Sequence, residues 1–114
     1  MLIKSYQFGS MTVGEKEHRS DLKIIEGKVI PSWWRQEGHV VDVADVDDIL
    51  AAKPETLVVG RGDPGRMRVS DSLRAALASA HIQLIEGPTA QAIATFNRLS
   101  ESDQKVAGAF HLTC

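Results

Sequence analysis

The sequence predicts an α/β domain with a partly parallel sheet, and three observations support this prediction. The length of 114 residues suits one compact domain, so residues 1–114 are interpreted as a single domain. The hydrophobic fraction of 43% and the charged fraction of 25% are typical of a globular protein rather than a disordered chain. Short apolar runs rich in β-branched residues alternate with segments of helical periodicity, which is the element order of α/β folds.

The first third of the chain predicts an N-terminal antiparallel β-meander. Apolar and polar side chains alternate there with a period of about two, and glycines occur where tight reversals are expected. We expect about three antiparallel strands within residues 1–34. The predicted pieces are a strand over residues 2–8, a turn over 13–16, a return strand over 18–25 and a reversal at Glu26-Gly27-Lys28 into residues 29–31.

The remaining chain predicts an α-β-α-β-α-β order. Asp42 is a good N-cap for the first helix, which ends at Lys53-Pro54 because proline disfavours helical geometry in the residue before it. In the last strand, Val106 and every second residue to Leu112 should face one side of the sheet. The order implies right-handed crossovers, with the clearest parallel unit from Thr56 to Ile85. The later elements are a strand over residues 56–60, a helix from Ser70 or Asp71, a strand over 82–85, a helix from Pro88-Thr89 and a strand over 105–114.

Charge and targeting signals exclude several classes of protein. The formal net charge is −2, which argues against nucleic-acid binding and against a polybasic membrane contact. Cys114 is the single cysteine, so no internal disulfide is expected. The sequence has no apolar run long enough for a membrane span and no signal-peptide layout, so we expect a cytoplasmic protein.

The hexapeptide from Gly60 to Gly65 matches the pattern G-x-G-x-x-G directly after a predicted strand. Glu86 ends the next strand, where a dinucleotide site has its ribose-binding carboxylate. The third glycine should open a helix, however, and Met67-Arg68-Val69 intervene, so a dinucleotide site is disfavoured. We interpret the hexapeptide as a long turn whose glycines need positive φ. The alternative is a small-anion or phosphate site, because Arg61 and Arg66 lie beside the glycines.

Two adjacent tryptophans, Trp33 and Trp34, are the most unusual feature of the sequence. On an extended chain they point to opposite faces, so one belongs to the core and the other covers a helix, a ligand or a partner. Arg35 is placed to stack on an indole, and arginine with aromatic residues is enriched at interface hot spots. The alternative is that both tryptophans pack inside a thin fold and have no surface role.

No catalytic or metal-binding signature is recognisable, and no cofactor is predicted. The histidine and cysteine spacings do not match those of metal sites or of nucleophilic catalysis. His39 lies near Glu37 without a further ligand at a suitable spacing. His111 lies on a predicted buried strand and is interpreted as a hydrogen-bonded core histidine in preference to a catalytic one.

Several segments together resemble the Mth-domain family of small proteins, which includes the adipogenesis-associated Mth-domain protein and is similar to mitochondrial complex I assembly factors. The resemblance implies a single three-layer α/β domain with a central mixed sheet, and it allows the last strand to run antiparallel to its neighbours. It carries no established catalytic residues, and relatives with a known role act in complex assembly or as regulatory binding proteins. The segments are Phe8-Gly9, Ser20-Asp21, Trp33-Trp34-Arg35 with Gly38-His39, Val58 to Gly62 with Gly65 and Met67, Pro88-Thr89, and His111 to Cys114.

We therefore expect a non-enzymatic protein that binds a protein partner or assists assembly of a complex. One alternative is a protein that binds a small anionic ligand, or an unrecognised enzyme, with its site at the Gly60–Gly65 loop. Another alternative is a homodimer in which an exposed tryptophan covers the twofold contact. The candidate ligand- or partner-binding residues are Trp34, Arg35, His39, Gly60, Arg61, Gly62, Gly65, Arg66 and His111.

Overall fold

The structure is a computed structural model that describes residues 2–114, with ten strands and three α-helices in that range. The strands are β1 (Ile3–Gln7), β2 (Ser10–Val13), β3 (Lys16–His18), β4 (Leu22–Ile25), β5 (Lys28–Ile30), β6 (Val40–Val41), β7 (Thr56–Arg61), β8 (Arg68–Val69), β9 (Gln83–Gly87) and β10 (Val106–His111). The helices are a 3-10 turn at Val43–Val46, α1 (Asp47–Ala52), α2 (Asp71–Ser79) and α3 (Thr89–Glu101).

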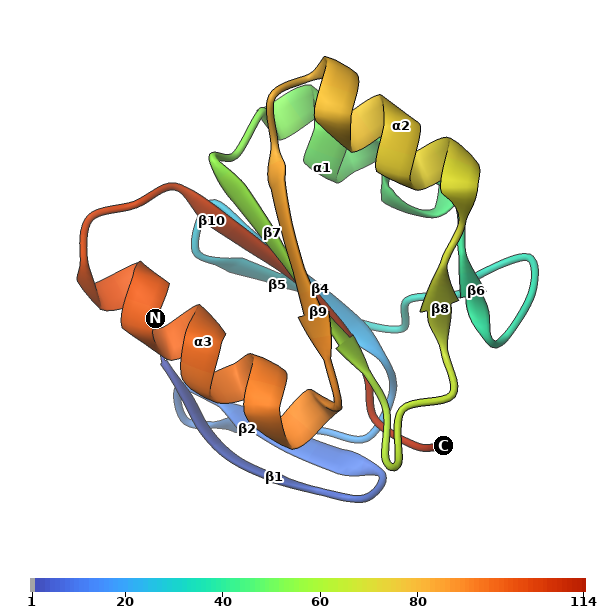
Figure 1. The fold of residues 1–114 in the computed structure, drawn as a ribbon. Coiled ribbons are helices and arrows are strands. Elements are labelled where there is room, and N and C mark those ends of the chain that lie inside the picture. Colours follow the sequence, from blue (N-terminus) through green and yellow to red (C-terminus); the bar gives the residue numbers. More distant parts are fainter. Residues whose placement is uncertain (1) are drawn as a thin grey trace.

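Five strands form a central mixed sheet in the order β5-β4-β10-β7-β9. β7 pairs in parallel with β9 and with β10, whereas β4 pairs antiparallel with β10 and with β5. Figure 1 shows α1 and α2 on one face of this sheet and α3, with β1 and β2, on the other. The predicted three-layer α/β architecture with a central mixed sheet is therefore confirmed.

The two helical crossovers explain why the helices lie on opposite faces. The connection β7-α2-β9 moves one strand outward, and the connection β9-α3-β10 returns across β7. Right-handed crossovers that travel in opposite directions place their helices on opposite faces of a sheet. The parallel unit predicted from Thr56 to Ile85 is confirmed. The last strand, β10, is antiparallel to β4 but parallel to β7. The antiparallel orientation that the resemblance allows therefore holds for one neighbour and not for the other.

The N-terminal region contains five short strands where the sequence analysis predicts about three. β1, β2 and β3 form a separate antiparallel sheet, while the β4–β5 hairpin joins the central sheet. The predicted strand over residues 18–25 is interrupted after His18, because Asp21 bonds to distant segments: its carbonyl accepts from the Trp33 amide at 2.8 Å. Local alternation carries no signal of such a contact. The two-residue strands β6 and β8, which pair in parallel, are also absent from the prediction.

Alternation along β10 divides the core into two clusters. Ala107 and Ala109 pack in the cluster under α1 and α2, whereas Phe110 and Leu112 pack in the cluster under α3. The predicted two-faced pattern of this strand is therefore confirmed. Gly108 has no space for a side chain, since a Cβ there would overlap the Phe110 ring, so the missing side chain lets the layers approach closely.

The predicted N-cap Asp42 is confirmed, although it caps the 3-10 turn that precedes α1, and the second helix starts where the sequence predicts. The Asp42 carboxylate accepts from the Val43 amide at 2.8 Å, and the Asp45 carboxylate accepts from the Asp42 amide at 2.9 Å. The Ser70 hydroxyl accepts from the Leu73 amide at 3.0 Å at the start of α2. None of the helices between residues 2 and 114 is long and apolar enough to cross a bilayer.

Candidate functional site

Three segments that are distant in sequence converge on the carboxyl end of β10. The Gly9 amide, in the β1–β2 turn, donates to the Leu112 carbonyl at 2.8 Å, and the Asp63 amide donates to the Thr113 carbonyl at 3.0 Å. The Leu112 amide donates to Asp21 Oδ1 at 2.7 Å. We refer to residues 111–113 and the residues that contact them as the β10 edge. Ligands of α/β proteins commonly bind at this end of a parallel sheet.

A buried ionic cluster of Asp21, Arg35 and His111 lies at the β10 edge. Asp21 Oδ2 accepts from Arg35 Nη2 at 2.8 Å and from His111 Nδ1 at 2.7 Å. The side chains of Arg35 and His111 are only 5% and 8% exposed. Arg35 Nη2 also lies 3.2 Å from His111 Nδ1, but both nitrogens direct a hydrogen at the same carboxylate, so they do not bond to each other.

The guanidinium of Arg35 also fixes the segment that carries the tryptophans. Arg35 Nε and Nη2 donate to the Gly38 carbonyl at 3.1 Å and 2.8 Å. Its carbon Cζ lies 4.6 Å from the centroid of the Trp33 ring, so the predicted stacking on an indole is confirmed for that residue. Trp33 Nε1 in turn donates to the Asp45 carbonyl at 2.9 Å. Arg35 therefore ties this segment to Asp21, which in turn bonds to His111 of β10.

The hydrogen bonds to Asp21 determine its protonation state. Burial alone raises the pKa of Asp21, but hydrogen bonds from His111, the Leu112 amide and Arg35 outweigh burial and hold its pKa below the ordinary value of 3.8. Asp21 is therefore ionised at neutral pH, and it places a proton of His111 on Nδ1.

Tyr6 also contacts the β10 edge, because its hydroxyl donates to the Leu112 carbonyl at 3.0 Å. Partial burial raises the pKa of Tyr6, and the charges of Asp63 and Asp21 raise it further.

Two buried nitrogen atoms of the cluster have no partner. Within residues 2–114, neither Arg35 Nη1 nor His111 Nε2 makes a hydrogen bond. Buried polar atoms nearly always have a partner in the protein or in ordered water, so these two atoms call for an explanation. His39 is an exposed residue whose ring packs edge-on against that of His111, with 5.7 Å between centroids. The fold thus brings together three predicted site residues and adds Asp21, which the sequence indicates only within the family resemblance.

The loop over residues 60–65, which we call the glycine loop, lies against the β10 edge, and hydrogen bonds hold its main chain in place. The Gly62 amide donates to Thr89 Oγ1 at 2.8 Å, and the Thr89 amide donates to the Gly62 carbonyl at 3.1 Å. Gly62 has a φ of +94°, and a Cβ there would overlap the Thr113 carbonyl oxygen. An anion cradle needs free amides, but those of Gly62 and Asp63 already donate to protein oxygens. Gly60 is packed against Phe110 and Thr89, and Gly65 has a φ of +120°.

The arginines near the loop are divided between internal pairs and the surface. Arg61 Nε donates to the Met67 carbonyl at 2.6 Å and lies 4.0 Å from Glu86. Arg74 pairs with both oxygens of Glu86, at 2.5 Å and 2.9 Å, whereas Arg66 is exposed. Strand β8 separates the loop from α2, so the third glycine does not open a helix. The arrangement does not match a dinucleotide site.

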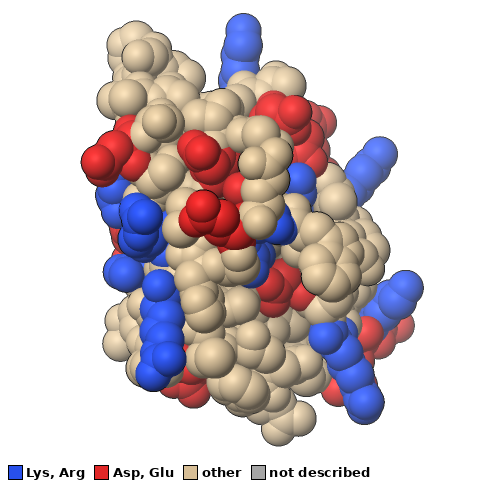
Figure 2. Space-filling model, turned by 90° about the vertical axis from the view of Figure 1, so that its right-hand side faces the viewer, with Lys and Arg blue, Asp and Glu red and all other residues tan. Residues whose placement is uncertain are grey.

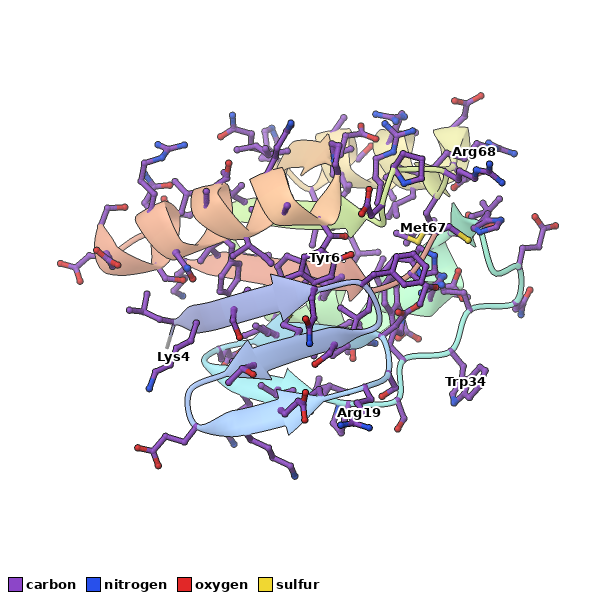
Figure 3. All side chains as sticks on the ribbon, turned by 90° about the horizontal axis from the view of Figure 1, so that it is seen from below. Lys4, Tyr6, Arg19, Trp34, Met67 and Arg68 are labelled. Atoms are coloured by element: carbon purple, nitrogen blue, oxygen red, sulfur yellow. The ribbon has the colours of Figure 1, made fainter. Side chains whose placement is uncertain are left out.

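The two adjacent tryptophans point in opposite directions, as the sequence predicts. Trp33 is 6% exposed and belongs to the core, whereas Trp34 is 86% exposed. Figure 3 shows Trp34 projecting away from the body of the protein. Phe8, which precedes the turn that is bonded to Leu112, is 59% exposed. Each of these exposed aromatic residues directly precedes a residue that is bonded at the β10 edge, Gly9 after Phe8 and Arg35 after Trp34.

A cavity of about 420 Å³ lies at the other end of β10, where this strand begins. Its wall includes Ile24 and Phe96, and Lys105 and Glu26 contribute charged groups. The predicted site residues all lie elsewhere, so this cavity is separate from the β10 edge.

The chain is similar in fold to several solved structures. It is similar to the solved structure named MT938, with 24% identity, a TM-score of 0.81 and coverage of 99% of this chain and 98% of that one. A conserved hypothetical protein of Pyrococcus horikoshii OT3 has 22% identity and a TM-score of 0.81, with both chains fully covered. A Bordetella pertussis protein described as a Mth938-like domain has 19% identity and a TM-score of 0.70, over 97% of this chain and 85% of that one. At such identities the likeness shows the fold alone.

The sequence itself assigns the family. The family model described as "Protein of unknown function (DUF498/DUF598)" matches residues 3–111, nearly the whole chain. This match and the structural neighbours confirm the resemblance to Mth-type domains that the sequence segments indicate. The chain therefore belongs to the DUF498/DUF598 family and has the Mth938-like fold.

Proposed function

We propose that this protein binds a protein partner through Trp34 and Phe8 at the β10 edge and acts without catalysing a reaction. The observation that carries the proposal is the exposed fraction of Trp34, 86%. A tryptophan side chain offers about 150–250 Å² of surface for burial, and tryptophan is among the residues most enriched at interface hot spots. Burial of this indole under a partner lowers the free energy of the complex.

Rigid presentation of Trp34 adds to the argument. The side chains on either side of it are fixed, because Trp33 is in the core and Arg35 is paired with Asp21. A partner that covers Trp34 therefore loses little free energy in ordering this segment. Arg35, expected from the sequence to contact the partner, is buried and supports its neighbour instead.

The charge of the surrounding surface favours a partner of mixed polarity. Figure 2 shows the face that carries β6 and β8, where acidic and basic side chains are interspersed among uncharged ones. A nucleic-acid surface would present a continuous basic stripe. A protein with an apolar pocket and a mixed polar rim fits this face better.

The test is affinity capture from the native host with three forms of the protein: wild type, Trp34→Ala and Leu2→Ala. Leu2 is a matched control because it is also an exposed apolar side chain, 41% exposed. We expect the same specific partner with wild type and Leu2→Ala, and its loss with Trp34→Ala. Retention of every partner by a folded Trp34→Ala variant would refute the assignment of this surface. Light scattering on the same samples shows whether the occupant is instead a second copy of the chain.

A further inference from the structure

We infer that Arg35 and His111 form a binding site for a small carboxylate, which is taken up together with one proton. The carrying observation is that both side chains are more than nine-tenths buried and that Arg35 Nη1 and His111 Nε2 have no partner within residues 2–114. Two orphaned nitrogens next to one shared carboxylate define a built site rather than a surface feature.

Hydrogen-bonding capacity specifies what the site accepts. Arg35 Nη1 is always a donor, because a guanidinium has no acceptor. Asp21 already takes the hydrogen on His111 Nδ1, so Nε2 becomes a second donor once the ring is protonated. A carboxylate has two oxygens and accepts one hydrogen from each of these nitrogens.

Charge balance favours a singly charged ligand. With a neutral imidazole, the opposite charges of Asp21 and Arg35 cancel, and the cluster is neutral. Protonation of His111 adds one positive charge, which a carboxylate neutralises. A doubly charged phosphate would leave an uncompensated negative charge in a buried site, which is costly. Binding of the carboxylate and of the proton to His111 are therefore coupled.

Access to the site is from the side of His39. The main chain of Gly62 also lies close to the imidazole, because a Cβ at this glycine would be 2.7 Å from His111 Cδ2. The exposed His39 ring packs edge-on against His111, so a ligand that approaches the imidazole from this side meets the His39 side chain. His39 is thus the side chain that a ligand displaces.

The groups around the imidazole determine how binding depends on pH. Asp21 and Arg35 contact His111 directly, and His39 packs on it from the same loop as Arg35. Tyr6 lies farther out and stays neutral near pH 7, since its pKa is raised above the ordinary value of 10.0 by partial burial. Asp63, whose charge also acts on Tyr6, stands on the glycine loop. Because the carboxylate needs a proton on His111 Nε2, its binding strengthens as pH falls.

The experiment is an acetate titration of the whole chain, followed through the imidazole resonances of His111 by NMR at about pH 6 and about pH 8, which bracket the ordinary titration of histidine. We expect saturable shifts, an affinity that falls about tenfold per pH unit where the ring is mostly neutral, and a titration of His111 that moves to higher pH with acetate. Inorganic phosphate in the same titration tests the choice of carboxylate.

Two variants separate the site from general effects of salt. His111→Asn keeps a donor near the position of Nδ1 for Asp21 but has no counterpart of Nε2, so it should fold and lose acetate binding. His81→Asn is the matched control, because His81 is exposed and has a φ of +59°, which asparagine tolerates. Unchanged His111 resonances with acetate would overturn the proposal, and so would saturable shifts of the Arg35 side-chain resonances that are equal in wild type and His111→Asn. Saturation by phosphate but not acetate would overturn the choice of carboxylate.

Discussion

Asp21 joins three parts of the chain through one carboxylate. Oδ1 accepts from the Leu112 amide, and Oδ2 accepts from Arg35 and His111. Removing one partner of a buried ion pair leaves the other charge uncompensated, which costs about 3–5 kcal/mol. The position of residues 33–38, the tryptophan segment, against β10 therefore depends strongly on Asp21.

Asp21→Ala should lower the free energy of unfolding near pH 7 by about 3–5 kcal/mol. The pKa of Asp21 is lower in the folded state than its ordinary value, so the unfolded chain binds more protons in the window between them. The stabilisation by Asp21 is present above about pH 4 and is lost as pH falls through the folded pKa. Urea denaturation of both proteins across this range measures the effect. A difference between them that grew as pH fell would contradict this account.

The adjacent tryptophans should respond very differently to the same substitution. Trp33→Ala removes a core side chain and should cost about 3–5 kcal/mol, whereas Trp34→Ala should change stability by no more than about 0.5 kcal/mol. Thermal unfolding measures both. Fluorescence quenching by iodide gives an independent check, since it should act on Trp34 and spare Trp33. Equal losses of stability would show that Trp34 is not free at the surface.

At the scale of the elements, the sequence predicts what local chemistry decides. Asp42 and Ser70 cap helices in the way that short polar residues before apolar periodicity indicate. Gly108, one of the small residues of β10, lies where Phe96 of α3 packs closely, since a Cβ there would be 3.1 Å from the Phe96 ring. The break after His18 escapes prediction because its cause is a contact between Asp21 and residues far along the chain. For the same reason, the residue pattern alone does not predict that Asp21 belongs to the site. The neighbours of Arg35 in the sequence also do not show whether its side chain is buried or exposed.

The end of β7 provides a test of how tightly the glycine loop is held. Gly62→Ala places a Cβ against the Thr113 carbonyl at a φ of +94° and should cost about 1–3 kcal/mol. Gly38→Ala is the control, because a Cβ at Gly38 meets nothing within 4 Å. The midpoints of urea denaturation compare the two variants. A Gly62→Ala protein as stable as Gly38→Ala would mean that the loop adapts easily and is not closed against β10.

At the scale of the whole molecule, the β10 edge gathers the β1–β2 turn, the tryptophan segment and the glycine loop around one strand end. The sheet order places β10 at the centre, between the hairpin of β4 and the parallel strands β7 and β9. Segments contributed by both halves of the chain are therefore held in fixed positions relative to one another. Such a rigid edge suits recognition, and its exposed aromatic side chains lie outside the buried cluster that supports them.

The affinity of the captured partner for wild type and for Trp34→Ala, measured by calorimetry with purified proteins, tests the central claim most directly. A hot-spot tryptophan contributes at least about 2 kcal/mol, so the dissociation constant should rise about thirtyfold or more in Trp34→Ala and stay unchanged in Leu2→Ala. A dissociation constant that is the same for wild type and Trp34→Ala would contradict the account, because the partner would then bind elsewhere.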